Sequence, residues 1–249
     1  LKTKVDTVVE FALPGSTKRL DIFIPSRNLA VEYHGLIWHS TAFSTDPLKD
    51  NVKHKEAASN GIRVIHVYQD EWLNQRAIVE RTLMSALGQL PRVAARKTTI
   101  GMLDGRVANE FYKENHLQGA TNPSVSIGLY HDNTLVAAMS FAVCRSVRTN
   151  TDKGLWELQR YAASMTVVGG AGKLLKHFLS INKCHTIVSY SDNRLFTGDM
   201  YRKIGFTLAH ETDPDYCYVS NSIKDGRIHK SKFQRKYLPS KLKNFDPDK

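Results

Sequence analysis

Two short apolar runs joined by a turn constrain the first part of the chain most strongly. The runs Arg19–Ile24 and Asn28–Tyr33 have strand-like composition, and the Pro-Ser-Arg sequence between them leaves room only for a tight turn. Together they predict a β-hairpin. Asp21 and Glu32 lie on its two strands, and a charge within a run such as Leu29–Tyr33 is costly to bury unless it is paired or bound to a metal. We therefore expect the hairpin to bring the two carboxylates together.

Hydrophobic spacing and turn residues predict a β-β-β-α-β-α order for the rest of this part. The expected elements are a strand at 5–13, the two hairpin strands, a helix at 49–60, a strand at 62–67 and a helix at 72–87. After Pro91 a second set follows, with a helix at 107–114, strands at 125–130, 134–141 and 156–162, a helix through 179, a strand at 186–190 and a helix at 198–204. The chain is thus predicted to be mixed α/β (α+β). The expected organisation is a first domain at 1–91, a linker at 92–99, a second domain at 100–223 and a basic tail at 224–249.

The net charge of +11 indicates a polyanionic partner, since basic proteins are attracted to nucleic acids. Residues 224–249 carry nine Lys/Arg and three Asp/Glu, either as a solvated end or as a grip on a phosphate backbone. We expect Lys230, Lys232, Arg235 and Lys236 of this tail, with Trp38, to contact double-stranded DNA.

Three scattered cysteines indicate a reducing compartment rather than a disulfide framework. No membrane span or signal peptide is visible, so an intracellular, cytoplasmic location is expected, with no membrane partner. The chain begins at Leu1 rather than Met, which is consistent with a fragment of a longer protein.

Acidic and histidine residues gather around the predicted hairpin. Asp21 and Glu32 could hold Mg²⁺ or Mn²⁺, which bind to one or two carboxylates together with water and phosphate oxygens. His34 or His39 could carry a proton near neutral pH, and Lys55 could hold a phosphate. This set suits metal-dependent hydrolysis of a phosphodiester. The alternative for each residue is ordinary surface or packing.

Several stretches in this region resemble the very-short-patch-repair endonuclease and its phage homing-endonuclease relatives, within the PD-(D/E)xK superfamily. The matching stretches are Leu20–Pro25, Ala30–His39, Lys53–Lys55 and Gly61–Trp72. The resemblance implies a restriction-endonuclease-like fold and an intracellular, phage-associated setting. It also implies that Asp21 is the central metal ligand, that His34 and His39 serve the active site, and that Asp70 orients one of them. An N-cap role for Asp70 is the alternative.

The chain departs from the wider superfamily pattern at the position two residues after the second acid. His34 stands there in place of the usual lysine, which puts the role of Lys55 in doubt. An upstream helical glutamate of this branch would have to be Glu10, which lies on a predicted strand, or would precede Leu1.

A glycine-rich stretch, Val167–Lys173, separates a strand from an amphipathic helix in the second part. Such a loop lets backbone N–H groups approach a phosphate, although a plain strand-to-helix turn is the alternative. With Ser191–Asn193 and Met200–Phe206 it resembles the GNAT acyltransferase fold over about residues 100–220. The resemblance implies an acyl-CoA loop at Gly170 and Gly172, but Val167 stands where Gln or Arg is usual.

Polar residues next to the cleft implied by this fold are Glu157, Tyr190, Asp192 and Tyr201. The sequence as a whole therefore favours a Mg²⁺-dependent DNA endonuclease whose second domain assists DNA binding. The alternatives are a GNAT-type acyltransferase or DNA-modification enzyme that uses the glycine-loop domain, and a non-catalytic DNA-binding protein. Mg²⁺ or Mn²⁺ is the favoured cofactor, and acetyl-CoA is the less favoured one.

Overall fold

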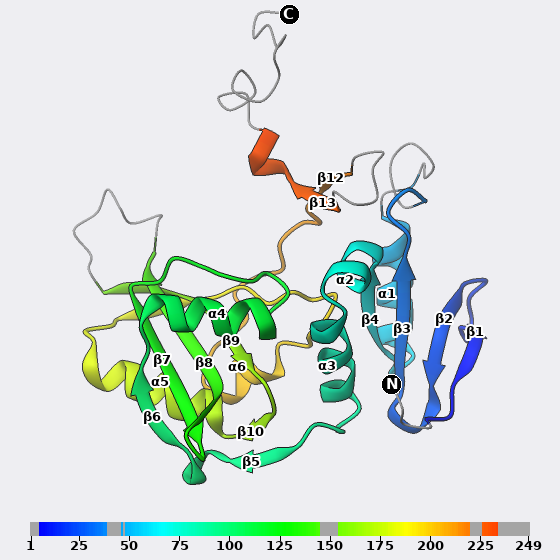
Figure 1. Ribbon diagram of the computed structural model, residues 1–249. Helices are drawn as coiled ribbons and strands as arrows, with labels where there is room; N and C mark the ends of the chain where they lie inside the picture. Colours follow the sequence, from blue (N-terminus) through cyan, green and yellow to red (C-terminus); the bar gives the residue numbers. More distant parts are fainter. Residues whose placement is uncertain (1–4, 39–45, 47, 145–153, 220–225, 234–249) are drawn as a thin grey trace, which may run out of the picture. The chain divides into compact units, whose positions relative to one another are not determined.

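The chain divides into two compact units (Figure 1). The computed structural model describes residues 5–38, 46, 48–144, 154–219 and 226–233. The N/C unit consists of residues 2–74 and 209–249, and the central unit consists of residues 75–208. Both contain sheets and helices, which confirms the predicted mixed α/β class. The predicted domain limits stay a prediction.

A four-stranded sheet with the order β1-β2-β3-β4 forms the N/C unit. Its strands are β1 (Val8–Ala12), β2 (Arg19–Ile24), β3 (Leu29–His34) and β4 (Arg63–Tyr68). The first three strands are antiparallel, and β4 is parallel to β3. The parallel pair needs a crossover connection, and this connection includes helix α1 (Lys49–Ser59).

The predicted hairpin is confirmed by the pairing of β2 with β3. A short 3₁₀ turn, η1 (Pro25–Arg27), joins the strands and ends at Asn28, whose φ of 44° is left-handed. Proline presets the first backbone angle of such a turn, and asparagine tolerates the left-handed region better than most residues. The pairing of Ile22 with Val31 fixes the register around the two acidic positions.

The core of the N/C unit lies between the sheet and α1. Its buried members are Leu13, Leu20, Phe23, Ala30, Ala57, Ile62 and Val64. Helix α2 (Gln69–Asn74) follows β4 directly. The C-terminal part of the unit adds the antiparallel pair β12 (Cys217–Val219) and β13 (Arg227–His229), then the short turn η5 (Lys230–Phe233).

A five-stranded sheet with the order β11-β9-β8-β7-β6 dominates the central unit (Figure 1). Its strands are β6 (Thr99–Met102), β7 (Val125–His131), β8 (Thr134–Val143), β9 (Leu155–Ala163) and β11 (Thr186–Val188). Neighbours from β6 to β9 are antiparallel, whereas β11 is parallel to β9. The helices are α3 (Arg76–Ala86), α4 (Gly105–Asn115), α5 (Gly170–Ile181) and α6 (Asp199–Lys203).

Side chains on the two faces of this sheet contact different helices. Along β8, Ala137, Met139 and Phe141 join a cluster with Leu174, Leu175 and Phe178 of α5. Ala138 lies between them in sequence and packs instead with Phe111 and Tyr112 of α4. Because successive side chains of a strand point to opposite faces, α5 covers one face and α4 covers the other.

Short elements accompany the five-stranded sheet of the central unit. The parallel pair β5 (Arg92–Ala94) and β10 (Thr166–Val168) lies beside the sheet, and η2 (Ala95–Lys97) follows β5. Val93 and Ala95 are buried in the α5-side core, so residues 92–99 are packed rather than extended in solvent. The β7–β8 turn has positive φ at both Asp132 and Asn133, as a two-residue hairpin loop requires.

None of the helices in the described part of the chain has the length and apolar character needed to cross a membrane.

Candidate functional site

The hairpin of the N/C unit does bring Asp21 and Glu32 together, but both carboxylates have protein partners. Asp21 Oδ2 accepts a hydrogen bond of 2.8 Å from the Tyr33 N–H, and Glu32 Oε1 accepts one of 2.9 Å from the Asp21 N–H. Glu32 Oε2 is ion-paired with Lys53 Nζ of α1. Burial raises the pKa of Glu32, while Lys53 and the Asp21 N–H oppose that rise.

Lys53 is one residue whose role sequence reasoning missed. Only 17% of its side chain is exposed, and its ammonium lies against the more deeply buried Glu32 carboxylate. A buried carboxylate needs a compensating positive charge. Lys53 lies four residues before the buried Ala57 on α1, so both are on the helix face that packs on the sheet, and Lys53 can provide this charge. Lys53 belongs to one of the stretches that resemble the endonuclease family, but nothing in the sequence indicated that it would pair with Glu32.

Three histidines of the N/C unit form a chain of hydrogen bonds. His34 Nε2 lies 2.8 Å from His66 Nδ1, and His66 Nε2 lies 3.0 Å from His54 Nδ1. His34 Nδ1 is 3.6 Å from Asp50 Oδ2 of α1. His34 and His66 are both buried, and burial lowers the pKa of His54. The structure therefore places His34 within a packed histidine chain between β3, β4 and α1.

Of the other predicted site residues of this unit, Glu10 lies opposite Asp21 in the register of β1 and β2, between the Val9–Ile22 and Phe11–Leu20 pairs. Lys55 is exposed on α1, and Glu10 is exposed on β1 with a positive φ of 51°. Trp38 is 69% exposed. His39, Arg235 and Lys236 lie outside the described residues.

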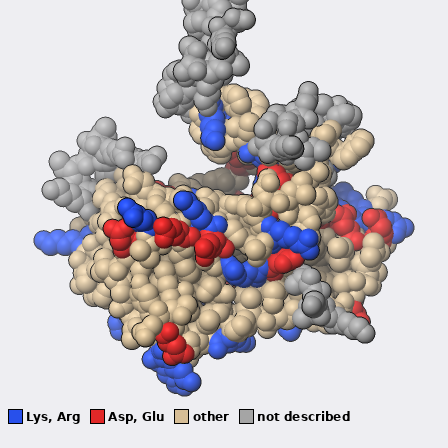
Figure 2. Space-filling view, viewed as in Figure 1, with Lys and Arg blue, Asp and Glu red and all other residues tan. Residues whose placement is uncertain are grey.

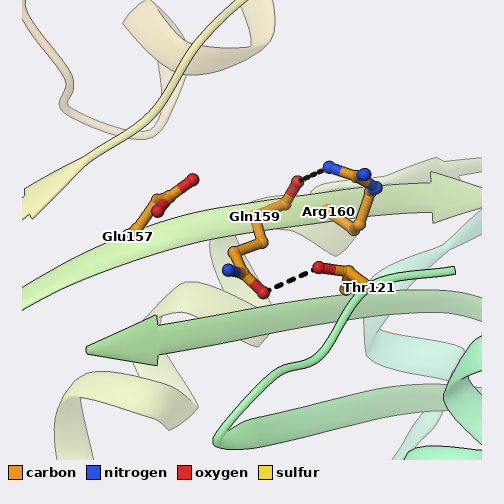
Figure 3. A pocket seen from close by; sticks show the side chains of 4 residues that line it. All are labelled: Thr121, Glu157, Gln159 and Arg160. Atoms are coloured by element: carbon orange, nitrogen blue, oxygen red, sulfur yellow. Dashed lines mark hydrogen bonds between the residues drawn. The ribbon is translucent and has the colours of Figure 1, made fainter. Parts of the chain in front are cut away.

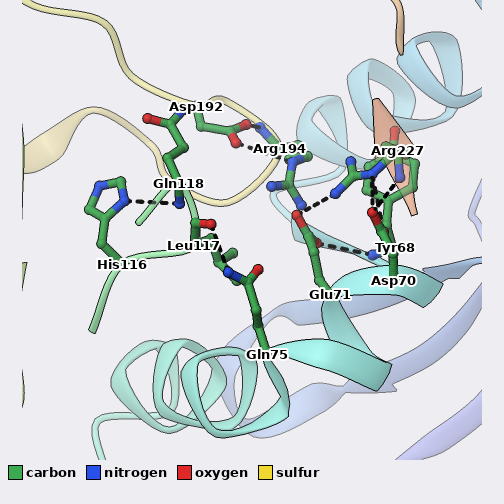
Figure 4. Close-up of polar contacts among 10 residues, drawn as sticks. All are labelled: Tyr68, Asp70, Glu71, Gln75, His116, Leu117, Gln118, Asp192, Arg194 and Arg227. Carbon is green, nitrogen blue, oxygen red and sulfur yellow. Dashed lines mark hydrogen bonds and ion pairs between the residues drawn. The ribbon is translucent and has the colours of Figure 1, made fainter. Parts of the chain in front are cut away.

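Asp70 binds an arginine from the C-terminal part of the chain rather than a histidine (Figure 4). Asp70 Oδ2 accepts the Arg227 backbone N–H at 2.9 Å, and its carboxylate also accepts Arg227 Nε at 3.1 Å. The same guanidinium donates to Glu71 Oε1 at 2.6 Å and lies 3.8 Å from the ring centroid of Tyr68. This set of contacts joins β13 to α2 and β4 within the N/C unit.

The basic residues expected to bind DNA are only partly within the described chain. Lys230 is ion-paired with Asp215, and Lys232 is exposed on η5. On the face shown in Figure 2, basic and acidic side chains are interspersed. Double-stranded DNA as a partner stays a prediction.

The central unit contains a pocket of about 350 Å³ at an irregularity of strand β9 (Figure 3). Phe141 of β8 pairs with Leu158 and Ser140 pairs with Arg160, so Gln159 is an extra residue, a β-bulge. A bulge breaks the alternation of side chains, because two residues of one strand face one residue of its partner. Consequently Gln159 and Arg160, although adjacent in sequence, both line the pocket together with Glu157 and Thr121.

The bulge also marks the place where β11 leaves β9. The parallel pairing of these strands ends with Val188 opposite Glu157, two residues before the extra residue. The predicted strand at 186–190 is therefore shorter than expected. Beyond this point no strand of the described chain pairs with the β11-facing edge of β9 over Gln159–Ala163. Such an edge presents backbone donors and acceptors to a ligand.

The polar groups of the pocket differ in how well they are satisfied. Gln159 Oε1 accepts a hydrogen bond of 2.9 Å from Thr121 Oγ1. Arg160 Nε donates to the Gly119 carbonyl at 3.2 Å and Nη1 donates to the Gln159 carbonyl at 2.7 Å. Partial burial lowers the pKa of Arg160, and the nearby Tyr112, Glu157 and Tyr201 oppose that change.

A hydroxyl pair lies where β9 and β11 separate. Ser189 Oγ lies within hydrogen-bonding distance of both the Leu158 carbonyl oxygen, at 2.9 Å, and the Tyr201 hydroxyl, at 3.0 Å. The Tyr201 hydroxyl in turn donates to the Tyr190 carbonyl at 3.3 Å. This links α6 to the backbone of β9 immediately after Glu157.

The predicted glycine loop forms the N-terminus of helix α5. Gly169 caps the helix with a left-handed φ of 81°, and no side chain caps its first N–H groups. A Cβ on Gly170 would lie 2.8 Å from the Val167 side chain, so that position is sterically restricted to glycine, whereas a Cβ on Gly172 would make only ordinary contact. Lys173 does not serve this loop, because its ammonium donates to the carbonyls of Ala95 and Thr98.

No family model and no curated protein matches the chain. Among solved structures, an aminoglycoside acetyltransferase from an uncultured soil metagenomic sample, in complex with sisomicin, is similar with 14% identity and a TM-score of 0.38. That match covers 50% of this chain and 98% of the other. An integron cassette protein from the mobile metagenome of V. cholerae is 12% identical with a TM-score of 0.36, over 52% of this chain and 96% of the other.

The prediction of a Mg²⁺-dependent endonuclease related to very-short-patch-repair and homing enzymes is wrong. In the N/C unit the cation beside Glu32 is Lys53, and the described residues hold no group of three or more His, Cys, Asp or Glu side chains that could bind a metal ion. The expected Mg²⁺ or Mn²⁺ is corrected on the same grounds, and we propose no hydrolytic role for the residues of this unit.

Proposed function

We propose that the central unit is a GNAT-type acyltransferase domain that acylates a small amine with acetyl-CoA. The observation that carries this proposal is the bulge at Gln159, which coincides with the separation of β9 from β11. It leaves an open strand edge next to the residues that line the polar pocket, and β10 and α5 follow this edge in the sequence. Bulges are over-represented next to active sites, and this one lies where the sheet opens.

Two groups of backbone N–H donors fit the donor substrate. Coenzyme A has an extended arm with amide groups, and such an arm can pair with an open strand edge such as Gln159–Ala163. It also has a diphosphate, which is favoured at a helix N-terminus where N–H groups are unpaired. The first turn of α5 carries only Gly170, Ala171 and Gly172 there, so no bulky side chain shields these groups.

Glu157 and Tyr201 fit the two proton transfers of acyl transfer to an amine. An acetyl-CoA thioester supplies the carbonyl carbon at which a C–N bond forms and a C–S bond breaks. Glu157, at the pocket, takes the proton that an ammonium group must lose to become a nucleophile. Tyr201, held by Ser189 where β9 and β11 separate, gives a proton to the departing sulfur, and the second proton that the nitrogen loses as the amide forms restores the Tyr201 hydroxyl.

The test is a calorimetric titration of the full chain with acetyl-CoA, using a matched pair of variants at Gly172. Gly172→Ala adds only a Cβ in ordinary contact with Ile204 and should bind as the wild type does. Gly172→Glu adds a negative charge in the first turn of α5, where it repels a diphosphate although it favours the helix itself. We expect it to abolish binding. Absence of binding by the wild type at about 1 mM acetyl-CoA, the upper end of usual substrate affinities, would refute the proposal.

A further inference from the structure

The pocket at the β9 bulge contains two opposite charges that do not pair with each other. Arg160 and Glu157 both line it, and in Figure 3 they lie on either side of Gln159. Within the described chain, the Arg160 side chain makes hydrogen bonds only to the carbonyls of Gly119 and Gln159 and forms no ion pair. The side chain of Glu157 has no hydrogen bond or ion pair with any described residue, although its backbone lies between β8 and β11 in the sheet.

A half-buried guanidinium that bonds only to neutral carbonyls has unused capacity. Arginine has five N–H donors in a planar fork suited to a carboxylate, and the Arg160 side chain makes hydrogen bonds within the described chain through Nε and Nη1 only, so Nη2 keeps its donors for a ligand. The carbonyls hold the side chain in place without neutralising its charge. Partial loss of water around Arg160 makes an anionic ligand more favourable there than at an exposed arginine.

The bulge explains why this cation lies in the pocket. In a regular strand Gln159 and Arg160 would point to opposite faces, and Arg160 would point away from Gln159 and Glu157. The extra residue places Arg160 and Ala162 on the α4 face while Leu158 and Tyr161 pack with the α5-side core. One irregularity therefore opens the strand edge and supplies the anion-binding group.

We propose that the acceptor substrate is a zwitterion, an amine that also carries a carboxylate, such as a free amino acid. Glu157 binds its ammonium group and Arg160 binds its carboxylate, while the Gln159 side chain, held by Thr121, lies between them. This inference rests on the proposed acyltransferase function for the fate of the amine. The binding site itself does not depend on that function.

The experiment measures binding of three matched ligand sets to the full chain by calorimetry, with and without saturating coenzyme A. The sets are the twenty protein amino acids, the amines that lack the carboxylate, and the N-acetyl amino acids that lack the ammonium group. We expect at least one amino acid to bind about tenfold or more tightly than both of its analogues, as the loss of one charge-assisted contact predicts. No binding by any amino acid up to about 10 mM, or equal binding of the decarboxylated amine, would overturn the inference.

Two variants assign the contacts. Arg160→Gln should weaken amino acid binding about tenfold, while the decarboxylated amine binds as it does to the wild type. Glu157→Gln should also weaken amino acid binding about tenfold, while the N-acetyl analogue binds as it does to the wild type. An equal loss of all ligands in a variant with an unchanged melting temperature contradicts the assignment. If Arg160→Gln does not fold, Arg160→Lys keeps the charge without the fork and should give a smaller loss for amino acids only. Amino acid binding without acetyl-CoA binding would refute the proposed acyltransferase function but would support the zwitterion-binding site.

Discussion

Removal of the His116 imidazole should make the central unit less sensitive to acid. His116 lies after α4, where its Nδ1 accepts a hydrogen bond of 3.1 Å from the Gln118 N–H (Figure 4). Burial, with the nearby positive charge of Arg160, lowers the pKa of His116 to about 4. The folded state therefore keeps this histidine neutral at pH values where the unfolded chain, with a histidine pKa of about 6.5, already binds a proton.

The sign and size of the effect follow from this difference in proton binding. Above pH 6.5 both states are neutral at His116, so it contributes no pH dependence; between pH 6.5 and about 4 the free energy of unfolding falls as pH falls. At about 1.4 kcal/mol for each pKa unit, the loss is up to about 3 kcal/mol at pH 4, and partial exposure of the ring reduces it toward about 2.

The variant His116→Asn keeps an acceptor near the Nδ1 position but cannot be protonated in this range, and exposed His185→Asn in the same unit is the control. We would measure urea unfolding at pH 7.5 and pH 4.5, followed by hydrogen exchange of β8 and β9 peptides so that the central unit is observed separately. The difference in unfolding free energy between the two pH values should be smaller by about 2 kcal/mol in His116→Asn and unchanged in the control. Equal pH dependence in His116→Asn and wild type would refute the reasoning.

Three further predictions concern particular contacts. Lys53→Met leaves Glu32 buried without its cation and should lower the unfolding free energy of the N/C unit by about 3 kcal/mol in urea titrations, with most of the loss recovered by adding Glu32→Gln; a single variant as stable as wild type would contradict this. Gly170→Ala should cost about 1–3 kcal/mol by thermal or urea unfolding, because its Cβ meets Val167 at 2.8 Å, whereas Gly172→Ala should be neutral or stabilising; equal effects would argue against the packing. Arg227→Met should increase hydrogen exchange in β13 peptides, since it removes the contacts that hold β13 to α2; unchanged exchange would show that other contacts hold the strand.

The sequence predicted those elements whose cause is local. Pro25 and Asn28 set the turn between β2 and β3, and the Asp132-Asn133 pair sets the turn between β7 and β8. Alternating or continuous apolar runs then identified the flanking strands. In each case the turn residues and the hydrophobic pattern lie within a few positions of each other.

The sequence could not predict contacts that depend on register or on distant segments. The bulge at Gln159 follows from how β9 pairs with β8, because nothing in the run Leu155–Ala163 marks one residue as extra. The partner of Asp70 is Arg227, 157 positions away in the chain. For this reason Arg160 did not stand out as a pocket residue.

The acidic pair shows how a correct local prediction led to a wrong function. The hairpin does align Asp21 with Glu32, but a buried carboxylate can be compensated by a metal ion or by a lysine, and the sequence does not distinguish them. In the structure the compensating charge is Lys53, contributed by a helix that joins β3 to β4. The chemistry inferred from the pair therefore depended on a contact that only the fold supplies.

The most direct test of the proposed acyltransferase is hydrogen exchange of the full chain with and without acetyl-CoA at about 1 mM. The account predicts slower exchange in two separate peptides, one over Gln159–Ala163 of β9 and one over Val168–Lys173 at the start of α5. Both effects should be lost in Gly172→Glu and kept in Gly172→Ala. Unchanged exchange in both peptides of the wild type, or protection confined to other parts of the chain, would contradict the account.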